Sequence, residues 1–181
     1  MLTTDRLLLR QWRDSDRAPF AQMNADPDVM RYFPATRTRA ESDETADRLE
    51  KHIAEHGFGF WAADLKDTGQ FVGFIGMQHV TTDMPCAPAV EIGWRLDKSV
   101  WGQGLAPEGA RACLAYAFSK LGLDEVVSFT NVDNIPSMRV MEKIGMTRDM
   151  DGDFDHPAIE DGSPIKPHVF YRIQATDTFS A

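Results

Sequence analysis

Two glycines, Gly102 and Gly104, stand where a strand-like run of the sequence passes into a helix-like run. The first backbone N–H groups of a helix have no intrahelical partner, and together with the helix dipole they attract an anion. Glycine lets the backbone come close to such an anion. The pattern predicts a phosphate-binding turn, with an ordinary glycine turn as the alternative.

Two common phosphate loops do not fit this turn. Pro107 takes the place of the third glycine in the dinucleotide fingerprint Gly-x-Gly-x-x-Gly. The Gly-Lys-Ser/Thr of a nucleoside triphosphate loop is missing from the segment as well. A nucleotide-binding oxidoreductase is therefore disfavoured.

A second motif follows roughly thirty residues further on, which is a strand–helix–strand–helix distance. The segment from Asn131 to Met146 reads Asn-Val-Asp-Asn-Ile-Pro-Ser-Met-Arg-Val-Met-Glu-Lys-Ile-Gly-Met. It resembles the Asn-x-x-Ser…Glu-Lys-x-Gly element of the GNAT superfamily of acyl-CoA-dependent N-acetyltransferases, in particular its RimJ/RimL-like branch of ribosomal-protein N-terminal acetyltransferases. The run Gln103-Gly104-Leu105-Ala106 resembles the pyrophosphate loop of the same superfamily.

The resemblance covers nearly the whole chain, because residues 2–10 look like the opening strand of that branch and residues 154–172 look like its ending. It implies an α+β fold: a mixed, mostly antiparallel central sheet of six to seven strands, with about four helices on both faces. It also implies a single domain over residues 1–181, which the length favours.

The resemblance implies acetyl-CoA as the co-substrate and no metal. In the family, backbone amides of the loop hold the pyrophosphate, the preceding strand binds the pantetheine arm through its backbone, and the counterpart of Asn134 contacts the pantetheine. Asn134 also suits the N-cap of the last helix, and both roles can hold together. Carried over to this sequence, the cofactor-binding residues are Ile92, Trp94, Leu96, Trp101, Gly102, Gln103, Gly104, Leu105, Ala106, Asn134 and Ser137.

Amide formation from a thioester needs a neutral amine, a donor to the tetrahedral oxyanion and a proton for the departing thiolate. A backbone N–H between Ile92 and Trp94 can serve the oxyanion. Many family members deliver the proton from a tyrosine at the position of Met141, so the resemblance leaves Ser137, one turn earlier, as the candidate acid. A plain first-turn helix serine is the alternative. Glu91 is the candidate base, against a solvated or arginine-paired strand glutamate.

We expect direct attack of the amine, since no pairing of cysteine with histidine suggests a covalent acyl-enzyme. The missing tyrosine keeps open a rival from another class, a non-catalytic acyl-CoA-binding or sensor module. Turnover of acetyl-CoA with amines separates the two interpretations.

The sequence leaves the acceptor open between a small amine and a protein N-terminus, because selectivity depends on pocket shape. The first helices and the final strands should shape its site, and we expect the aromatic side chains of Trp12, Phe33 and Trp61 to line it. A late segment rich in glycine, proline and aspartate contains Phe154 and His156. We expect it to be an ordered loop over the acceptor, with a solvated loop as the alternative.

The chain has 181 residues, 43% of them hydrophobic, and a formal net charge of −9. The excess of acidic over basic residues argues against nucleic-acid binding and favours a cationic acceptor. With no run of 18 apolar residues and no signal-like start, we expect a cytoplasmic protein without a membrane partner. Cys86 and Cys113 should be free thiols, no metal site is indicated, and the protein should be a monomer or a homodimer.

The elements that must position these residues follow from periodicity. A helical stripe through Ala110, Cys113, Leu114 and Ala117 predicts that the loop glycines open a helix. Alternation over 90–96 predicts the strand before them. The other expected strands cover 7–12, 60–65, 71–80, 125–130, 146–150 and 168–173, and the other helices cover 14–26, 38–57 and 136–144.

Overall fold

Residues 1–179 are described by a computed structural model, which contains nine β-strands, four α-helices and three short 3₁₀ helices. They form two compact units. Unit 1 comprises residues 1–78 and 93–113, and unit 2 comprises residues 79–92 and the chain from 114 on. β5 (Val90–Leu96) and α3 (Leu105–Ser119) each have one part in either unit.

The strands of unit 1 form an antiparallel sheet in which Leu9 lies opposite Ala63. The end of β5 continues this sheet, because the backbone N–H of Asp97 donates to the carbonyl of Val72 at 2.9 Å. The strand that leads to the glycine turn is therefore anchored on its neighbours. The order of these neighbours is β1 (Leu2–Thr3), β2 (Leu7–Arg10), β3 (Phe60–Leu65) and β4 (Phe71–His79).

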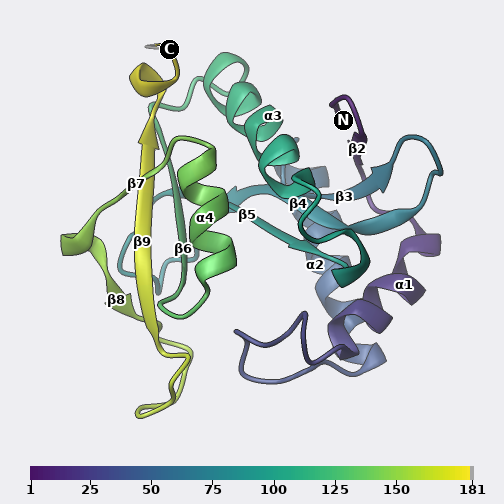
Figure 1. The fold of residues 1–181 in the computed structure, drawn as a ribbon, viewed down its shortest axis with the longest axis horizontal. Helices are drawn as coiled ribbons and strands as arrows, with labels where there is room; N and C mark the ends of the chain where they lie inside the picture. Colours follow the sequence, from purple (N-terminus) through teal and green to yellow (C-terminus); the bar gives the residue numbers. More distant parts are fainter. Residues whose placement is uncertain (180–181) are drawn as a thin grey trace. The chain divides into compact units, whose positions relative to one another are not determined.

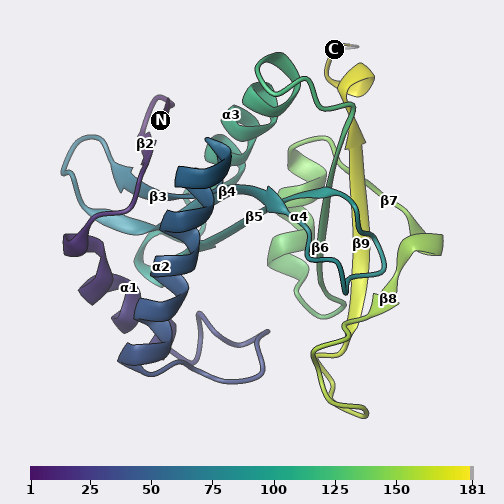
Figure 2. The same ribbon diagram turned by 180° about the vertical axis from the view of Figure 1, so that it is seen from behind.

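Two further helices of unit 1, α1 (Asp14–Ala25) and α2 (Arg39–His56), lie side by side in Figure 2. The Thr38 hydroxyl accepts from the backbone N–H of Glu41, and the Glu41 carboxylate accepts from the backbone N–H of Thr38 at 2.7 Å. This capping box starts α2. Gly57, with φ 76°, ends it in the left-handed conformation. Both ends of α2 confirm the bounds expected from the sequence.

The core of unit 1 is rich in aromatic side chains. The ring of Trp12 meets that of Phe20 edge-on, with centroids 4.8 Å apart, and its indole N–H donates to the carbonyl of Phe60 at 2.9 Å. Phe74 packs on both Phe20 and Phe60. Buried aromatic pairs of this kind hold the helices on the sheet.

Unit 2 is built around two long strands, β6 (Glu125–Asn131) and β9 (Pro167–Gln174), which run antiparallel along their whole length (Figure 1). The start of β5 pairs with β6 in parallel, where Glu91 lies opposite Val127. The remaining elements of this unit are α4 (Ile135–Lys143), β7 (Thr147–Arg148) and β8 (Phe154–Asp155), and both short strands pair with β9.

The structure confirms the α+β fold with a mixed, mostly antiparallel sheet, which has nine strands instead of the expected six to seven. β1 and β8 have two residues each, so no alternation of apolar residues could reveal them. β7 is shorter than the strand expected over 146–150, and β9 includes the strand expected over 168–173. Cys86 and Cys113 are free thiols. Within residues 1–179, no helix is both long and apolar enough to cross a membrane.

Candidate active site

The predicted phosphate turn lies in unit 1 between β5 and α3. Gly102 and Gly104 have φ angles of 74° and 78°. A residue with a Cβ rarely adopts these angles, so the backbone itself requires glycine at both positions. α3 begins at Leu105, and the carbonyl of Gly104 accepts from the backbone N–H of Glu108 at 3.2 Å. The backbone amides at the start of α3 therefore have the geometry of a helix N-terminus that can bind an anion.

Arg6 reaches this turn from the connection between β1 and β2. Its Nη1 donates to the carbonyl of Gln103 at 2.9 Å. A Cβ built on Gly104 would lie 3.7 Å from its Nη2. The guanidinium is half exposed, so it adds a positive charge at the edge of the turn. No spacing rule connects residue 6 with residue 104, and sequence reasoning missed this contact.

Glu108 ties Arg6 to the first turn of α3. Arg6 and Glu108 form an ion pair of 2.6 Å, and the hydroxyl of Thr4 donates to the same carboxylate at 2.5 Å. Partial burial alone would raise the pKa of Glu108, but the hydrogen bonds from Thr4 and Arg6 outweigh burial and lower it. The carboxylate is thus ionised near neutral pH, and Arg6 offsets its charge beside the turn.

Trp101 and Gln103 are fixed by contacts with their own segment. The indole N–H of Trp101 donates to the carbonyl of Leu96 at 2.8 Å, while 50% of the residue stays exposed. The amide of Gln103 donates to the carbonyl of Ser99 at 3.2 Å. The predicted loop residues from Trp101 to Ala106 therefore lie in one ordered turn, and an apolar ring is exposed at its start.

On β5, the side chains of Ile92 and Leu96 are buried, and that of Trp94 is half-buried. Such a strand offers a ligand its backbone more than its side chains, as the expected pantetheine contact requires. In unit 2 the hydroxyl of Ser128 donates to the carbonyl of Ile92 at 2.8 Å. Glu91 is half-buried there, beside β6.

Asn134 is the N-cap of α4, as expected. Its side-chain oxygen accepts from the backbone N–H of Ser137 at 3.3 Å, and its amide donates to the hydroxyl of Thr130 at 2.8 Å. Ser137 is half-buried in the first turn of α4. Met141 is buried. The resemblance places a tyrosine at this position in many family members, and methionine offers no hydroxyl in its place. The roles of Asn134 and Ser137 toward a ligand remain predictions.

Phe154 and His156 lie in an ordered, packed part of unit 2. Phe154 stacks on His168, with centroids 5.8 Å apart, and meets Phe129 edge-on at 5.4 Å. The ring centroid of His156 lies 5.0 Å from that of His168. Burial lowers the pKa of both histidines. The loop packs back on the sheet as expected, and its role in covering an acceptor stays a prediction.

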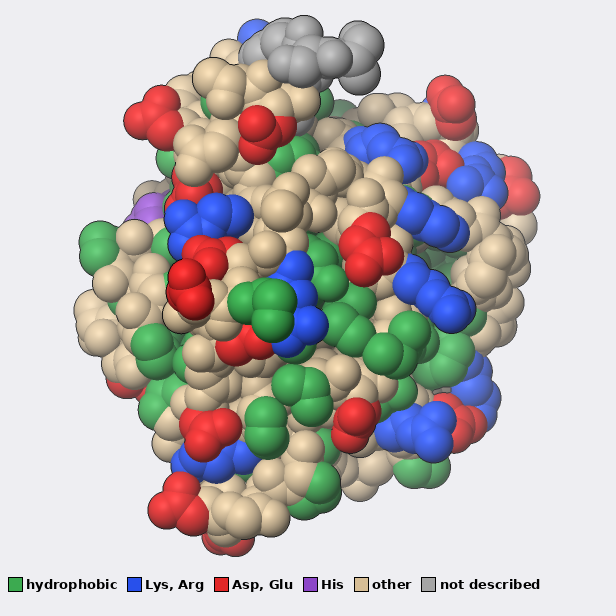
Figure 3. Space-filling model, turned by 60° about the vertical axis from the view of Figure 1, so that its left-hand side comes forward, with side chains coloured by type: hydrophobic (Ala, Val, Ile, Leu, Met, Phe, Trp, Pro, Cys, Tyr) green, Lys and Arg blue, Asp and Glu red, His purple; other side chains and the backbone are tan. Residues whose placement is uncertain are grey.

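The acidic side chains of this loop are partly neutralised within unit 2. Asp161 pairs with Lys166 at 2.6 Å, and Asp153 pairs with Arg148. Figure 3 shows acidic side chains next to basic ones on the face that it draws. Local pairing therefore weakens the attraction for a cation that the net charge suggests.

Of the aromatic residues expected at the acceptor site, Trp12 and Trp61 are core residues of unit 1, and Trp61 is only 1% exposed. Both contribute to the wall of a hollow of ≈ 340 Å³, which Arg10 and Arg13 also line. Phe33 is 38% exposed and lies in the α1–α2 connection. Their roles toward an acceptor likewise remain predictions.

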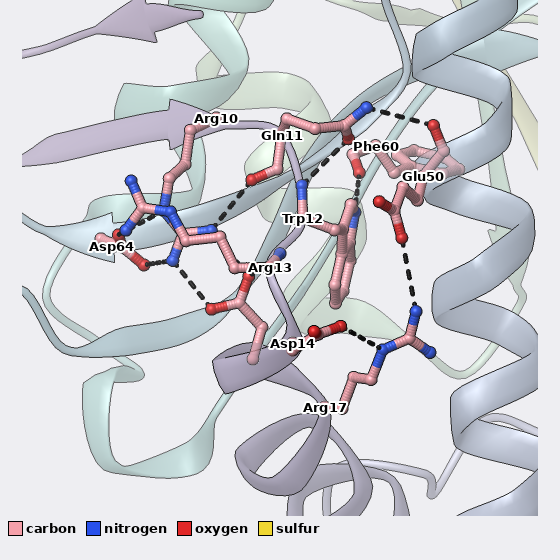
Figure 4. A network of polar contacts seen from close by, with 10 residues as sticks. Arg10, Gln11, Trp12, Arg13, Asp14, Arg17, Glu50, Phe60 and Asp64 are labelled. Carbon is pink, nitrogen blue, oxygen red and sulfur yellow. Dashed lines mark hydrogen bonds and ion pairs between the residues drawn. The ribbon is translucent and has the colours of Figure 1, made fainter.

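Arg10 holds the wall of this hollow through a buried ionic network (Figure 4). It donates to Asp64 on β3 and to Asp16 on α1, each at 2.6 Å. Burial alone would lower the pKa of Arg10, but the hydrogen bonds with Asp16 and Asp64 outweigh burial and raise it. Because every member is paired and buried, the network joins β2, β3 and α1 rigidly.

The chain is similar in sequence and fold to known proteins. Residues 6–147 match the family model described as Acetyltransferase (GNAT) domain. The chain is 35% identical over 146 residues to the "Uncharacterized protein YkkB" of Bacillus subtilis (strain 168), covering 80% of this chain and 84% of that protein. It is 33% identical over 153 residues to the "FsC-acetyl coenzyme A-N(2)-transacetylase" of Aspergillus fumigatus, covering 81% and 64%. The solved structure of an acetyltransferase (GNAT family) from Bacillus anthracis is similar with a TM-score of 0.80 and 27% identity, covering 97% and 98%.

Proposed function

Because the chain belongs to the GNAT acetyltransferase family, we propose that it moves an acetyl group from acetyl-CoA to a primary amine by direct attack of the amine. The observation that carries this proposal is the turn from Gly102 to Ala106, whose two left-handed glycines open α3. The relative from Aspergillus fumigatus is named as an acetyl coenzyme A transacetylase acting at N(2), which supports an amine as the acceptor.

The turn is the proposed site for the pyrophosphate of acetyl-CoA. Backbone N–H groups of Gly104, Leu105 and Ala106 would bind the phosphates, and Arg6 would add a charged donor at the edge. The backbone of β5 would bind the pantetheine arm like an added strand. Asn134 and Ser137 are proposed to contact the same arm, on the strength of the resemblance of their segment. The proposed reaction uses no metal.

The reaction forms the carbon–nitrogen bond of the amide and breaks the carbon–sulfur bond of the thioester, while one proton leaves the amine and one reaches the thiolate. The amine nitrogen attacks the thioester carbonyl, a backbone N–H on β5 stabilises the oxyanion, and the carbon–sulfur bond then breaks. We assign the amine proton to Glu91, directly or through water, and the proton for the departing thiolate to Ser137. Glu91 is half-buried on β5, and Ser137 is half-buried on α4. Met141 supports this assignment, because it replaces the tyrosine that could otherwise donate the proton from the same face of α4.

The finer parts of the assignment rest on the resemblance. We place the chain in the RimJ/RimL-like branch because of its opening strand and its segment around Asn134, and we propose that residues 1–181 act as one catalytic domain. The family match over residues 6–147 includes parts of both units, which supports a single domain. We propose that the protein acts in the cytoplasm on a small amine or a protein N-terminus, as a monomer or a homodimer.

Release of free thiol from acetyl-CoA tests the function. Purified protein is mixed with acetyl-CoA and a panel of polyamines, aminoglycosides, amino acids, amino acid amides and short peptides. We expect amine-dependent thiol release with at least one class. Tight binding of acetyl-CoA without thiol release in any mixture would favour the non-catalytic sensor over the enzyme. The transacetylase name of the relative from Aspergillus fumigatus disfavours the sensor.

A further inference from the structure

The half-buried side chain of Arg95 reaches from β5 to α1 within unit 1. Its Nη1 donates to the side-chain oxygen of Asn24, near the end of α1, at 2.9 Å. Its guanidinium lies 4.1 Å from the ring centroid of Phe33 and 5.4 Å from that of Phe74. Its Nε is buried and has no hydrogen-bond partner among the described residues. One of its donors therefore remains unused.

Arg37 is the second cation at this place. It follows Phe33 in the connection between α1 and α2, and its backbone N–H donates to the carbonyl of Asn24 at 2.9 Å. Its Nε is also buried without a hydrogen-bond partner among the described residues. Burial and, second to it, the positive charge of Arg37 lower the pKa of Arg95 to about 10. Arg95 thus keeps its charge at neutral pH although a like charge lies near it.

No carboxylate in residues 1–179 forms an ion pair with Arg37 or Arg95. The carboxylate of Glu41 interacts electrostatically with Arg37, but it forms its hydrogen bonds with the backbone N–H and the hydroxyl of Thr38. Buried charges are usually paired, and a neighbouring like charge adds to their cost. An anion bound between the two guanidinium groups would satisfy both.

The position of the pair suggests where the anion comes from. β5 is the strand proposed to carry the acetyl donor on its backbone, and Arg95 follows Ile92 by three residues, roughly 10 Å along a strand. The planar guanidinium of arginine presents paired N–H donors, which match the two oxygens of a carboxylate better than the compact ammonium of lysine does. We infer that Arg37 and Arg95 bind a carboxylate of the acceptor, which would then be an amine that also carries a carboxylate, such as an amino acid or a short peptide.

This inference rests on the proposed function and narrows it, in contrast to the cationic acceptor suggested by the net charge of −9. Net charge acts through solvent and is screened, whereas two half-buried guanidinium groups act at contact distance. The exposed ring of Phe33, which lies against Arg95, would form the apolar side of the same site.

Matched acceptors test the inference. Acetyl transfer is measured for amino acids and dipeptides, each against its own carboxamide, with spermidine as a purely cationic amine. We expect the carboxylates to be preferred over the amides in kcat/KM by roughly ten- to a hundredfold, the range of one or two hydrogen bonds to a charged group. Equal or better transfer to the amides or to spermidine would overturn the inference and leave the proposed function intact.

Variants assign the preference to the pair. Arg37→Gln and Arg95→Gln should each raise KM for the carboxylates more than KM for the amides, so that the acid-to-amide preference falls. Arg39→Gln is the matched control, since Arg39 is exposed and pairs with Asp43 at 2.8 Å. An unchanged acid-to-amide ratio in Arg37→Gln would contradict the inference, even if Arg95→Gln failed to fold.

A binding experiment covers the case in which no amine is acetylated. N-acetylglycine and its amide are titrated into the wild-type protein and the Arg37→Gln variant, and the melting temperature is followed. Stabilisation by the carboxylate alone, lost in Arg37→Gln, would support the anion site although the proposed function had failed. Equal shifts with both probes would overturn the site.

Discussion

Arg6 donates a hydrogen bond to the carbonyl of Gln103 at 2.9 Å, across 97 positions of the chain. The same guanidinium pairs with Glu108 at the start of α3. The connection between β1 and β2 thereby supports the turn proposed to bind acetyl-CoA. The shape of this turn depends on its glycines and on the side chain of Arg6, which lies near the N-terminus.

Replacing Arg6 by glutamine should weaken acetyl-CoA binding roughly three- to tenfold, since the lost donor is half exposed and partly screened. Calorimetry with acetyl-CoA measures the change, and Arg39→Gln is again the control. Equal affinity in both variants would show that Arg6 does not act on the ligand.

Replacing Gly104 by valine should weaken acetyl-CoA binding by roughly 2 kcal/mol, about thirtyfold, because the left-handed turn would be lost. Gly122 offers a matched control. It follows the other end of α3 with φ 65° and has open space around a Cβ. Gly122→Val should lower stability by about 1–2 kcal/mol and leave the affinity unchanged. An equal loss of affinity in both variants would refute the special role of the turn.

Replacing Ser137 by alanine should lower kcat roughly ten- to a thousandfold with little effect on acetyl-CoA affinity, as expected for a proton donor in the transition state. The cap of α4 should survive, because Asn134 accepts from the backbone N–H of residue 137. Ser119→Ala, at the exposed end of α3, is the control. Full activity of Ser137→Ala would leave the serine as an ordinary first-turn residue.

Two neighbouring histidines of unit 2, the buried His168 and the half-buried His156, should make stability depend on pH. Burial lowers the pKa of His168 and His156 in the folded state, so the unfolded chain binds protons more readily. The free energy of unfolding should therefore fall as pH drops below about 6.5, the ordinary histidine pKa. Urea unfolding between pH 7.5 and 5.5 measures the slope, and His168→Asn should flatten it. An unchanged slope in that variant would assign the effect to other groups.

Local patterns of the sequence predicted most elements of the fold. The capping box at Thr38, the stop at Gly57, the strand over 60–65 and the alternation over 90–96 agree with the structure, because each depends on neighbours in sequence. The glycine turn could be found in the same way. β1 and β8 were not expected as separate strands, because two residues contain no period.

Contacts between distant segments could not be predicted. Arg6 reaches Gln103, and Arg95 reaches Asn24 across 71 positions, through side chains whose partners no local pattern identifies. Trp12 and Trp61 were expected at the acceptor site, but aromatic side chains suit both a core and a pocket, so the sequence could not separate the two roles. In the structure both are buried in unit 1.

Transfer of a labelled acetyl group is the decisive test of the proposed acetyltransferase activity. The protein is incubated with isotope-labelled acetyl-CoA and a cell lysate or the amine panel, and products are identified by mass spectrometry, with Gly104→Val as the control. We expect a labelled N-acetylated amine that forms with the wild-type protein and is strongly reduced with Gly104→Val. Intact binding of labelled acetyl-CoA with no labelled amine in any mixture would contradict it.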